Sequence, residues 1–247
     1  MQTRFLALCL SLLVGKIAAH GAVQSYVING VLYEGYQPFL PPDDQVTIGR
    51  PFPGIDPLRG TDNMNLSCNN DGWAAPRQIS APIRAGDSIT AIWGPWIHPF
   101  GPAIVYMARC PSSCSLANSI DLDWFKIDQT GLIEGNVVDG FWGLGIVRNE
   151  GVYTVTIPAA LADGEYLIRH ELISLHGEGG PQYYPECAQL EVTGGGGSLP
   201  PKRFLATLPG AYKPTDPGLT LDLYDPASWN IYNYTVPGPD VWKGEVV

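Results

Sequence analysis

The sequence predicts an all-β fold, an antiparallel β-sandwich of the immunoglobulin-like or fibronectin-like kind with long loops. Three observations lead to it. The 247 residues include 29 glycines and 23 prolines, which punctuate the chain at short intervals. Between them lie short apolar runs that alternate with a period of two, as strands with one buried face do. No segment shows a long helical period with a cap at each end.

Composition supports this class and excludes others. Apolar residues make up 45% of the chain and charged residues only 15%. The apolar share is enough for a core, and the low charge content argues against a coiled coil or an acidic disordered tail. The net charge of −10 argues against nucleic acid as a partner, because a surface that holds phosphates must be basic.

The first element along the chain is a secretory signal at residues 1–19. Arg4 gives it a positive start, and residues 5–14 form an apolar run too short to span a bilayer core of about 30 Å. Residues 17–19 are typical of a cleavage site. We therefore expect a secreted, extracellular protein without a membrane anchor. Cleavage after Ala19 would make His20 the first residue of the mature protein.

The alternating runs predict five strands. They cover residues 87–93, 103–110, 151–158, 166–175 and 188–193. Residues 194–198, Gly-Gly-Gly-Gly-Ser, predict a flexible linker. Seven aromatic residues follow it, so residues 198–247 are expected to wrap back over the sandwich as a surface segment. Residues 20–247 would then form a single domain without a separate carbohydrate-binding module.

The cysteines predict disulfide bonds. Loss of the signal removes Cys9 and leaves four cysteines, an even number that predicts two disulfides in an oxidising compartment. Four cysteines allow three pairings. Cys110 and Cys114 are near enough in sequence to close one short loop, and Cys68 with Cys187 would then close a long one. Two sequons, at residues 65–67 and 233–235, make Asn65 and Asn233 candidate glycosylation sites.

The chain has four histidines, of which His20 is the most informative. Signal cleavage would place a free α-amine beside its ring Nδ1, and both can bind one metal ion. A second imidazole, from a loop such as the one holding His98, would complete three nitrogens. Nitrogen-rich tetragonal coordination favours Cu(II). A histidine can also follow a signal peptide by chance, so the residues around it must show whether His20 is a metal ligand.

Those surrounding residues resemble a known family. They read HGAV at residues 20–23, HPFGP at 98–102, QYYPECAQL at 182–190 and PGAYK at 209–213. In this order they are similar to the mature start, the second-histidine loop, the third block and the C-terminal loop of fungal lytic polysaccharide monooxygenases of auxiliary activity family nine. The matches span nearly the whole chain after the signal.

The resemblance implies a site with one copper per chain. His20 would bind the metal through its α-amine and Nδ1, His98 through Nε2, and Tyr184 would lie at the axial position. Gln182 would donate a hydrogen bond to the oxygen co-substrate. His176 would give or take protons, which its reference pKa of about 6.5 suits.

The resemblance also implies an activity. Residues 20–247 would be one monooxygenase catalytic domain that cleaves β-1,4-glucan chains, cellulose above all, by copper-dependent oxidation. Dioxygen or hydrogen peroxide would be the co-substrate, and a small reductant or a redox protein would supply electrons. The enzyme would act as a monomer outside the cell, with disulfides Cys68–Cys187 and Cys110–Cys114.

Exposed aromatic side chains are expected to stack on the apolar faces of sugar rings. Tyr212 is the first candidate for such a contact, and Tyr33 and Tyr36 are further ones. His170 is expected instead to be a hydrogen-bonded structural residue, because an unbroken strand would place it about 20 Å from His176.

The chain departs from the family pattern in two places. The family's loop reads His-x-Gly-Pro, whereas Pro99 and Phe100 both intervene here between His98 and Gly101. The loop of residues 177–181 is also short. Both changes predict altered geometry around the second and third histidines, while no ligand is missing.

Two other functions stay open. A conventional glycoside hydrolase would need two carboxylates about 5–9.5 Å apart. Asp121, Asp123 and Glu186 are candidates, but their spacing singles out no pair. A non-catalytic secreted protein that binds copper or carbohydrate would keep His20 and need not keep the residues around it.

Overall fold

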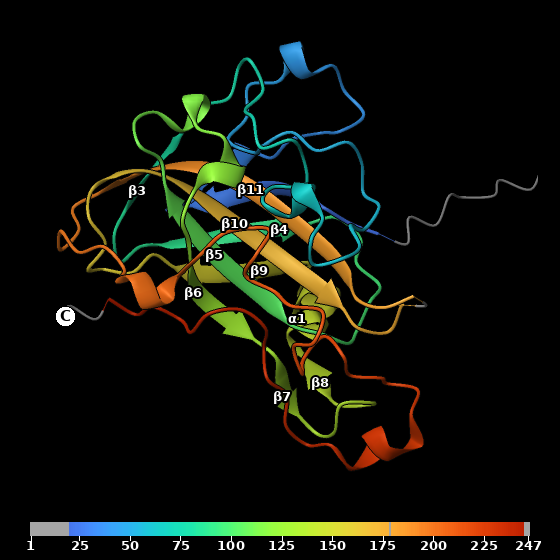
Figure 1. Ribbon diagram of the computed structural model, residues 1–247. Helices are drawn as coiled ribbons and strands as arrows, with labels where there is room; N and C mark the ends of the chain where they lie inside the picture. The colour runs from blue at the N-terminus through green and yellow to red at the C-terminus, as the bar shows by residue number, and fades with distance from the viewer. Residues whose placement is uncertain (1–19, 178, 245–247) are drawn as a thin grey trace, which may run out of the picture.

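Two β-sheets pack face to face and form a sandwich (Figure 1). This computed structural model describes residues 20–177 and 179–244. It confirms the predicted all-β sandwich. The predicted signal at residues 1–19 lies outside the described residues.

The two sheets differ in size. The smaller has the order β2-β1-β4-β9 and the larger the order β12-β6-β5-β10-β11-β3. The smaller sheet consists of β1 (Val23–Ile28), β2 (Val31–Glu34), β4 (Ser88–Trp93) and β9 (Val152–Thr156). The larger sheet consists of β3 (Ala81–Arg84), β5 (Ala103–Arg109), β6 (Trp124–Thr130), β10 (Gly164–Ser174), β11 (Gln182–Thr193) and β12 (Leu205–Ala206).

The connections hold the remaining elements. A two-stranded ribbon of β7 (Leu132–Glu134) and β8 (Phe141–Trp142) leads into helix α1 (Gly143–Glu150). The described loops also contain short 3₁₀ turns at Pro42–Asp44, Met64–Leu66, Cys114–Leu116, Ser119–Asp121, Lys202–Phe204 and Pro226–Asn230. With 8 residues in α1, no helix in the described ranges is long and apolar enough to cross a membrane.

All five predicted strands are present, as β4, β5, β9, β10 and β11. Strand β11 begins six residues earlier than predicted, at Gln182 rather than Ala188. The pairing is antiparallel throughout both sheets except where β3 runs parallel to β11. The strands that the alternation missed include β1, β2 and β3, which are only 4 to 6 residues long.

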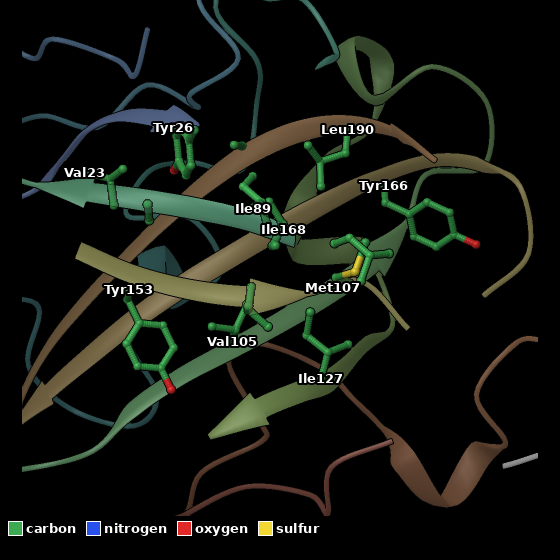
Figure 2. Packing of buried hydrophobic residues seen from close by; sticks show 14 of the residues in the cluster. Val23, Tyr26, Ile89, Val105, Met107, Ile127, Tyr153, Tyr166, Ile168 and Leu190 are labelled. Atoms are coloured by element: carbon green, nitrogen blue, oxygen red, sulfur yellow. The ribbon is translucent and has the colours of Figure 1, made fainter. Parts of the chain in front are cut away.

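The main core lies between the two sheets. Figure 2 shows Tyr26 of β1 and Ile89 of β4 from the smaller sheet near Val105 of β5, Ile168 of β10 and Leu190 of β11 from the larger one. Each of these side chains is almost completely buried. Burial of apolar area of this kind is the main favourable term in folding.

Strands β10 and β11 form the central hairpin, in register from Gly164 opposite Val192 to Ser174 opposite Gln182. Successive side chains of a strand point to opposite faces. The inner face of the hairpin packs in the main core, and the outer face belongs to a second apolar cluster. Because both faces are covered, nearly every residue of the two strands is buried.

The C-terminal segment covers this outer face. Figure 1 shows it in orange to red, crossing the larger sheet. Arg169 donates from both terminal nitrogens to Glu171 at 2.7 Å, and both side chains are fully buried. The hydroxyl of Tyr212 also donates to Glu171, and Lys126 Nζ donates to the carbonyl of Pro237 at 2.8 Å. Hydrogen bonds to charged groups contribute about 1.5–3 kcal/mol each. The bonds from Tyr212 and to Pro237 therefore stabilise the docked position of the segment.

The predicted flexible linker is wrong. Residues 194–198 form hydrogen-bonded turns against residues 159–163. The amide of Gly195 donates to Asp163 at 2.9 Å, and the amide of Ser198 donates to the carbonyl of Ala160 at 2.8 Å. A Cβ on Gly195 would lie 1.8 Å from the Leu161 carbonyl oxygen. Glycine is therefore present for a close backbone approach, not for flexibility.

Both implied disulfides are present. Cys68 is bonded to Cys187 over a sequence separation of 119, and Cys110 to Cys114 over a separation of 4. Cys187 lies in β11, so the first bond ties the long loop between β2 and β3 to the central hairpin.

His170 corrects one expectation. It is buried, at 1% exposure, but neither ring nitrogen has a hydrogen-bond partner among the described residues. The side chain points into the main core, where its ring lies 5.8 Å from that of Tyr26. The expected hydrogen bonding is wrong because this face of β10 meets mainly apolar side chains.

Replacing His170 with leucine should reduce the loss of stability at acid pH. Burial lowers the pKa of His170 to about 3, against about 6.5 for an exposed imidazole. Between these values the unfolded chain binds a proton that the folded chain does not, so stability falls as the pH falls below about 6.5. At pH 5 this one group removes about 2 kcal/mol.

Thermal unfolding at pH 7 and pH 5 measures this effect. The decrease in Tm between the two pH values should be smaller in His170→Leu than in the unmodified chain. Both proteins keep every other titratable group, so the difference isolates His170. Equal decreases would show that His170 does not contribute to acid sensitivity.

Candidate functional site

The pairing of β1 with β4 brings two predicted ligands together. These strands are antiparallel neighbours, so residues just before β1 lie beside residues just after β4. The approach is close: a Cβ on Gly21 would lie 2.6 Å from the carbonyl oxygen of Pro95. The rings of His20 and His98 consequently stack, with centroids 5.4 Å apart and planes at 28°.

The larger sheet supplies a third ring. Tyr184 points from the inner face of β11, and its centroid lies 5.7 Å from that of His20 and 5.9 Å from that of His98. Its hydroxyl lies 3.3 Å from His98 Nε2 and donates to Gln182 Oε1 at 2.8 Å. The site therefore joins both sheets at the end of the sandwich where β10 ends and β1 begins.

Trp96 forms the inner wall of the site. Its ring packs edge-on against His98, with centroids 5.2 Å apart, and against Tyr184, with centroids 4.8 Å apart. Its Nε1 donates to the backbone carbonyl of His98 at 2.9 Å. A single buried side chain thus restricts both neighbouring rings.

A chain of hydrogen bonds fixes the ring of His98. Its Nδ1 lies 3.0 Å from His176 Nε2, and His176 Nδ1 lies 3.0 Å from Ser174 Oγ. If the lone pair on His98 Nε2 is to bind a metal, Nδ1 must carry the proton and donate it to His176. His176 then donates from its own Nδ1 to Ser174. Metal-binding histidines generally donate their second N–H in this way.

The loop after His98, which has one residue more than the family pattern, contacts the end of β10 and the residue after it. The carbonyl of Phe100 accepts from the amide of Leu175 at 3.1 Å, and the Phe100 ring lies edge-on to His176 with centroids 6.1 Å apart. Gly101, with φ of 136°, allows this approach, because a Cβ there would lie 1.9 Å from the Ile173 carbonyl oxygen. Phe100, one of the two residues between His98 and Gly101, therefore packs against the ring of His176.

The electrostatics keep the rings of His98 and His176 neutral. Burial, followed by the nearby rings of His176 and His20, lowers the pKa of His98 to about 4. Burial also lowers the pKa of His176 and raises that of Tyr184. Asp56 is the nearest acid, 3.7 Å from His20 Nδ1 and 95% exposed. Neutral imidazoles keep the lone pairs that a metal needs.

These donors fit copper. Two imidazoles and a phenol meet within one small volume, and imidazole is a ligand that suits copper. In the described ranges no group of three or more His, Cys, Asp and Glu side chains is arranged to hold a metal. A metal ion here would therefore depend on Tyr184 and the α-amine of His20 as well as on the two rings. That set is the nitrogen-rich one that Cu(II) prefers.

The match to a known family decides the identification. A family model described as Auxiliary Activity family 9 (formerly GH61) matches residues 20–234. The chain belongs to this family. It is 45% identical over 237 residues to AA9 family lytic polysaccharide monooxygenase B of Heterobasidion irregulare, with 95% of this chain and 96% of that protein covered. It is 38% identical to monooxygenase D of Thermothelomyces thermophilus, with 95% and 93% covered.

Solved structures show the same fold. The crystal structure of HiLPMO9B matches with a TM-score of 0.87 at 44% identity, covering 91% of this chain and 100% of that one. A cellulose-active polysaccharide monooxygenase from M. thermophila matches with a TM-score of 0.83 at 36% identity, covering 92% and 100%. AA9 lytic polysaccharide monooxygenases are copper-dependent oxidoreductases, and this chain is an enzyme of that class.

Tyr212 does not lie on the surface of this monooxygenase. It is 4% exposed, and its hydroxyl points inward to Glu171 on the outer face of β10. The expectation that it stacks on sugar rings is wrong. The buried ion pair draws the hydroxyl inward, and the sequence around Tyr212 gives no sign of that partner 41 residues away.

The other two expected stacking residues are also engaged in packing. Tyr36 is 7% exposed and packs edge-on against Phe52, with centroids 5.6 Å apart, so the expectation for Tyr36 is wrong as well. Tyr33 of β2 is half-buried against the main core. Neither ring lies free on the surface.

An aromatic residue that the sequence did not single out lies beside the site. Tyr224 is 71% exposed, and its hydroxyl donates to the backbone carbonyl of His176 at 2.7 Å. Trp96, Ser174 and Asp56 were missed too. Trp96 and Ser174 each precede a predicted histidine by two residues, which is the spacing that places side chains on one face of an extended segment.

The carboxylates considered for a hydrolase lie in two separate places, away from the three rings of the site. Glu186 is buried in the inner face of β11, and burial raises its pKa. Asp121 and Asp123 are exposed and line a separate surface hollow with Arg109. Glu186 therefore shares no hollow with Asp121 or Asp123.

Removing the hydroxyl of Tyr212 should destabilise the fold without changing the site. Tyr212→Phe deletes a buried hydrogen bond to a charged carboxylate, and we expect a loss of about 1–3 kcal/mol in the free energy of unfolding. Tyr224→Phe is the matched control, since it deletes one hydroxyl from an exposed ring and should change stability by less than about 0.5 kcal/mol. Denaturant titration measures both, and equal losses would contradict the assigned burial.

Proposed function

We propose that the chain is a secreted enzyme that cleaves β-1,4-glucan, cellulose above all, by copper-dependent oxidation. The observation that carries this proposal is the convergence of His20, His98 and Tyr184 from both sheets at one end of the sandwich. Membership of the AA9 family supports it, and one structurally similar monooxygenase is described as cellulose-active.

The site would hold one copper per chain. After cleavage at Ala19, His20 would bind through its α-amine and Nδ1 and His98 through Nε2, and the phenol oxygen of Tyr184 would complete the donor set. The chemistry supplied by bound copper is one-electron transfer from an external donor, either a small reductant or a redox protein, and activation of dioxygen or hydrogen peroxide. This chemistry would insert one oxygen atom into a C–H bond of a sugar carbon beside the glycosidic link, and the hydroxylated product would then break at that link.

The surrounding residues hold this donor set in place. His176 and Ser174 keep the proton of His98 on Nδ1, so Nε2 faces His20 and Tyr184. The carbonyl of Gln182 accepts from Tyr184, which leaves the amide nitrogen of Gln182 to donate to the oxygen co-substrate. Positioning groups of this kind are typically worth 10–100-fold in metal affinity or activity.

The substrate would lie over the exposed end of the site. Tyr224 presents a free aromatic face beside His176, and sugar rings stack on such faces. We further propose that residues 20–247 act as one catalytic domain and a monomer. Asn233 is exposed and Asn65 half-buried, so Asn233 is the sequon better placed to carry a glycan.

Oxidised products that require a reductant are the test of this function. The copper-loaded chain beginning at His20 should release oligosaccharides with oxidised ends from cellulose only with ascorbate and dioxygen or peroxide. Mass spectrometry of the products measures this. His98→Ala should lower the yield by more than about 100-fold, since even groups that support a ligand contribute about 10–100-fold. Reductant-independent release of ordinary sugars would identify a hydrolase instead, and copper binding without oxidised products a non-catalytic protein.

A chain with two extra residues before His20 should lose tight copper binding. The extension turns the α-amine into an amide, which no longer offers a lone pair at neutral pH. Calorimetric titration with Cu(II) measures the affinity, and the same protein after enzymatic removal of the extension is the control. Unchanged affinity would show that the terminal amine is not a ligand.

A further inference from the structure

One charged side chain beside the proposed copper site has no part in the donor set. Oδ1 of Asp56 lies 3.7 Å from His20 Nδ1, and the side chain is 95% exposed. Asp56 belongs to the long loop between β2 and β3. Because the side chain is exposed, burial does not explain its place beside His20, and its negative charge is the property left to consider.

The residues on either side of Asp56 hold its backbone near the start of β1. Ile55 packs against a small apolar cluster that contains Ala22, two residues after His20. Pro57 favours extended conformations for the backbone of Asp56, since a proline ring clashes with the helical conformation of the residue before it. Both neighbours therefore limit how far the carboxylate can move from His20.

A second attachment joins the same loop to β11. Leu58 exchanges backbone hydrogen bonds of 2.9 and 3.0 Å with Tyr183, the residue before Tyr184. The loop is thus attached near two proposed ligands, at the chain that follows His20 and at the strand that carries Tyr184. Asp56 stands in the sequence between these two attachments, which keep its charge at the site.

The proposed donors bring no negative charge of their own. An amine and two imidazoles bind a metal ion as neutral groups, and the hydroxyl of Tyr184 keeps its proton, which it donates to Gln182 Oε1 at 2.8 Å. Among the described residues, Asp56 alone makes an ion-pair contact with a histidine of the site. Arg59 carries the opposite charge, and its Nη1 donates to the carbonyl of Gly180 at 3.3 Å. The anion placed to act on a bound copper ion is therefore Asp56.

We propose that Asp56 raises the affinity of the site for Cu(II) more than its affinity for Cu(I), and so lowers the reduction potential of the bound copper. A carboxylate attracts a doubly charged ion twice as strongly as a singly charged one. At separations of about 4–6 Å in water, the attraction between two unit charges changes a binding constant about three- to fivefold. A second unit of charge squares that factor. The inference rests on the proposed function, which supplies the copper.

Metal titrations of Asp56→Asn test this proposal. The chain beginning at His20 is titrated with Cu(II) by calorimetry and, in the absence of oxygen, with Cu(I) by competition against a coloured chelator. At about 10 mM salt the substitution should raise the Kd for Cu(II) about tenfold and the Kd for Cu(I) about threefold. The difference, a factor of about three, corresponds to a rise of about 30 mV in the reduction potential. Equal increases for the two ions, or no increase for either, would overturn the proposal.

Two matched variants and a change of salt separate the charge of Asp56 from its other properties. Asp56→Glu keeps the charge and should leave both Kd values within about twofold. Asp121→Asn removes the same charge from an exposed position beside Arg109, at the end of β5 away from the copper site, and should leave both values unchanged. A similar increase in Asp121→Asn would overturn the proposal, because it would show an effect of net charge alone.

At about 1 M salt, where charges are screened beyond about 3 Å, the effect of Asp56→Asn should be mostly lost. An effect that persists at this salt concentration would also overturn the proposal. The affinity of the unmodified chain for copper and its oxidised products test the proposed function. Only the ratio of the two increases in Kd tests Asp56, so the proposed function and this inference can fail separately.

Discussion

The alternation of side chains along the β10–β11 hairpin is the constraint on which the rest of the structure depends. Both faces of the hairpin are buried, so each residue is committed to one of two environments. The inner face carries Ser174, Gln182 and Tyr184 to the proposed copper site. The outer face carries Glu171 and Tyr183 to the C-terminal segment, where both contact Tyr212. A slip of one residue would exchange all of these side chains and remove Tyr184 and Gln182 from the proposed site.

The proposed copper site also needs contacts that hold His20 and the long loop between β2 and β3 in place. The pairing of β1 with β4 places His20 beside His98. The Cys68–Cys187 disulfide links the loop that follows residues 55–62 to β11. Trp96, packed edge-on against His98 and Tyr184, joins the two sheets at the point where the donors meet. The donor set is therefore assembled by three separate long-range contacts, which is why no short stretch of sequence contains it.

Much of this was predictable from the sequence, and the failures have physical causes. His20, His98 and Tyr184 lie in motifs whose order resembles the family, and their neighbours in space are the expected ones. Tyr212 lies in an equally recognisable motif, but its burial depends on Glu171 and Arg169, two residues apart on a strand that gave no hint of an ion pair. The glycine run at residues 194–197 has the composition of a linker, whereas its conformation is set by the backbone of residues 159–163. The sequence pattern therefore predicts strands and motifs, whereas the exposure of a side chain such as Tyr212 depends on partners that are distant in the sequence.

The hydrogen bonds around His176 join the substrate face to the metal site. The ring of His176 accepts a hydrogen bond from Nδ1 of His98. The backbone carbonyl of His176 accepts a hydrogen bond from the hydroxyl of Tyr224. Tyr224 is therefore joined through His176 to the proposed copper ligand His98 by two hydrogen bonds. Phe100, from the loop after His98, packs edge-on against the ring of His176. Phe100, in the loop that departs from the family pattern, thus lies against the histidine that joins the substrate face to the proposed ligand His98.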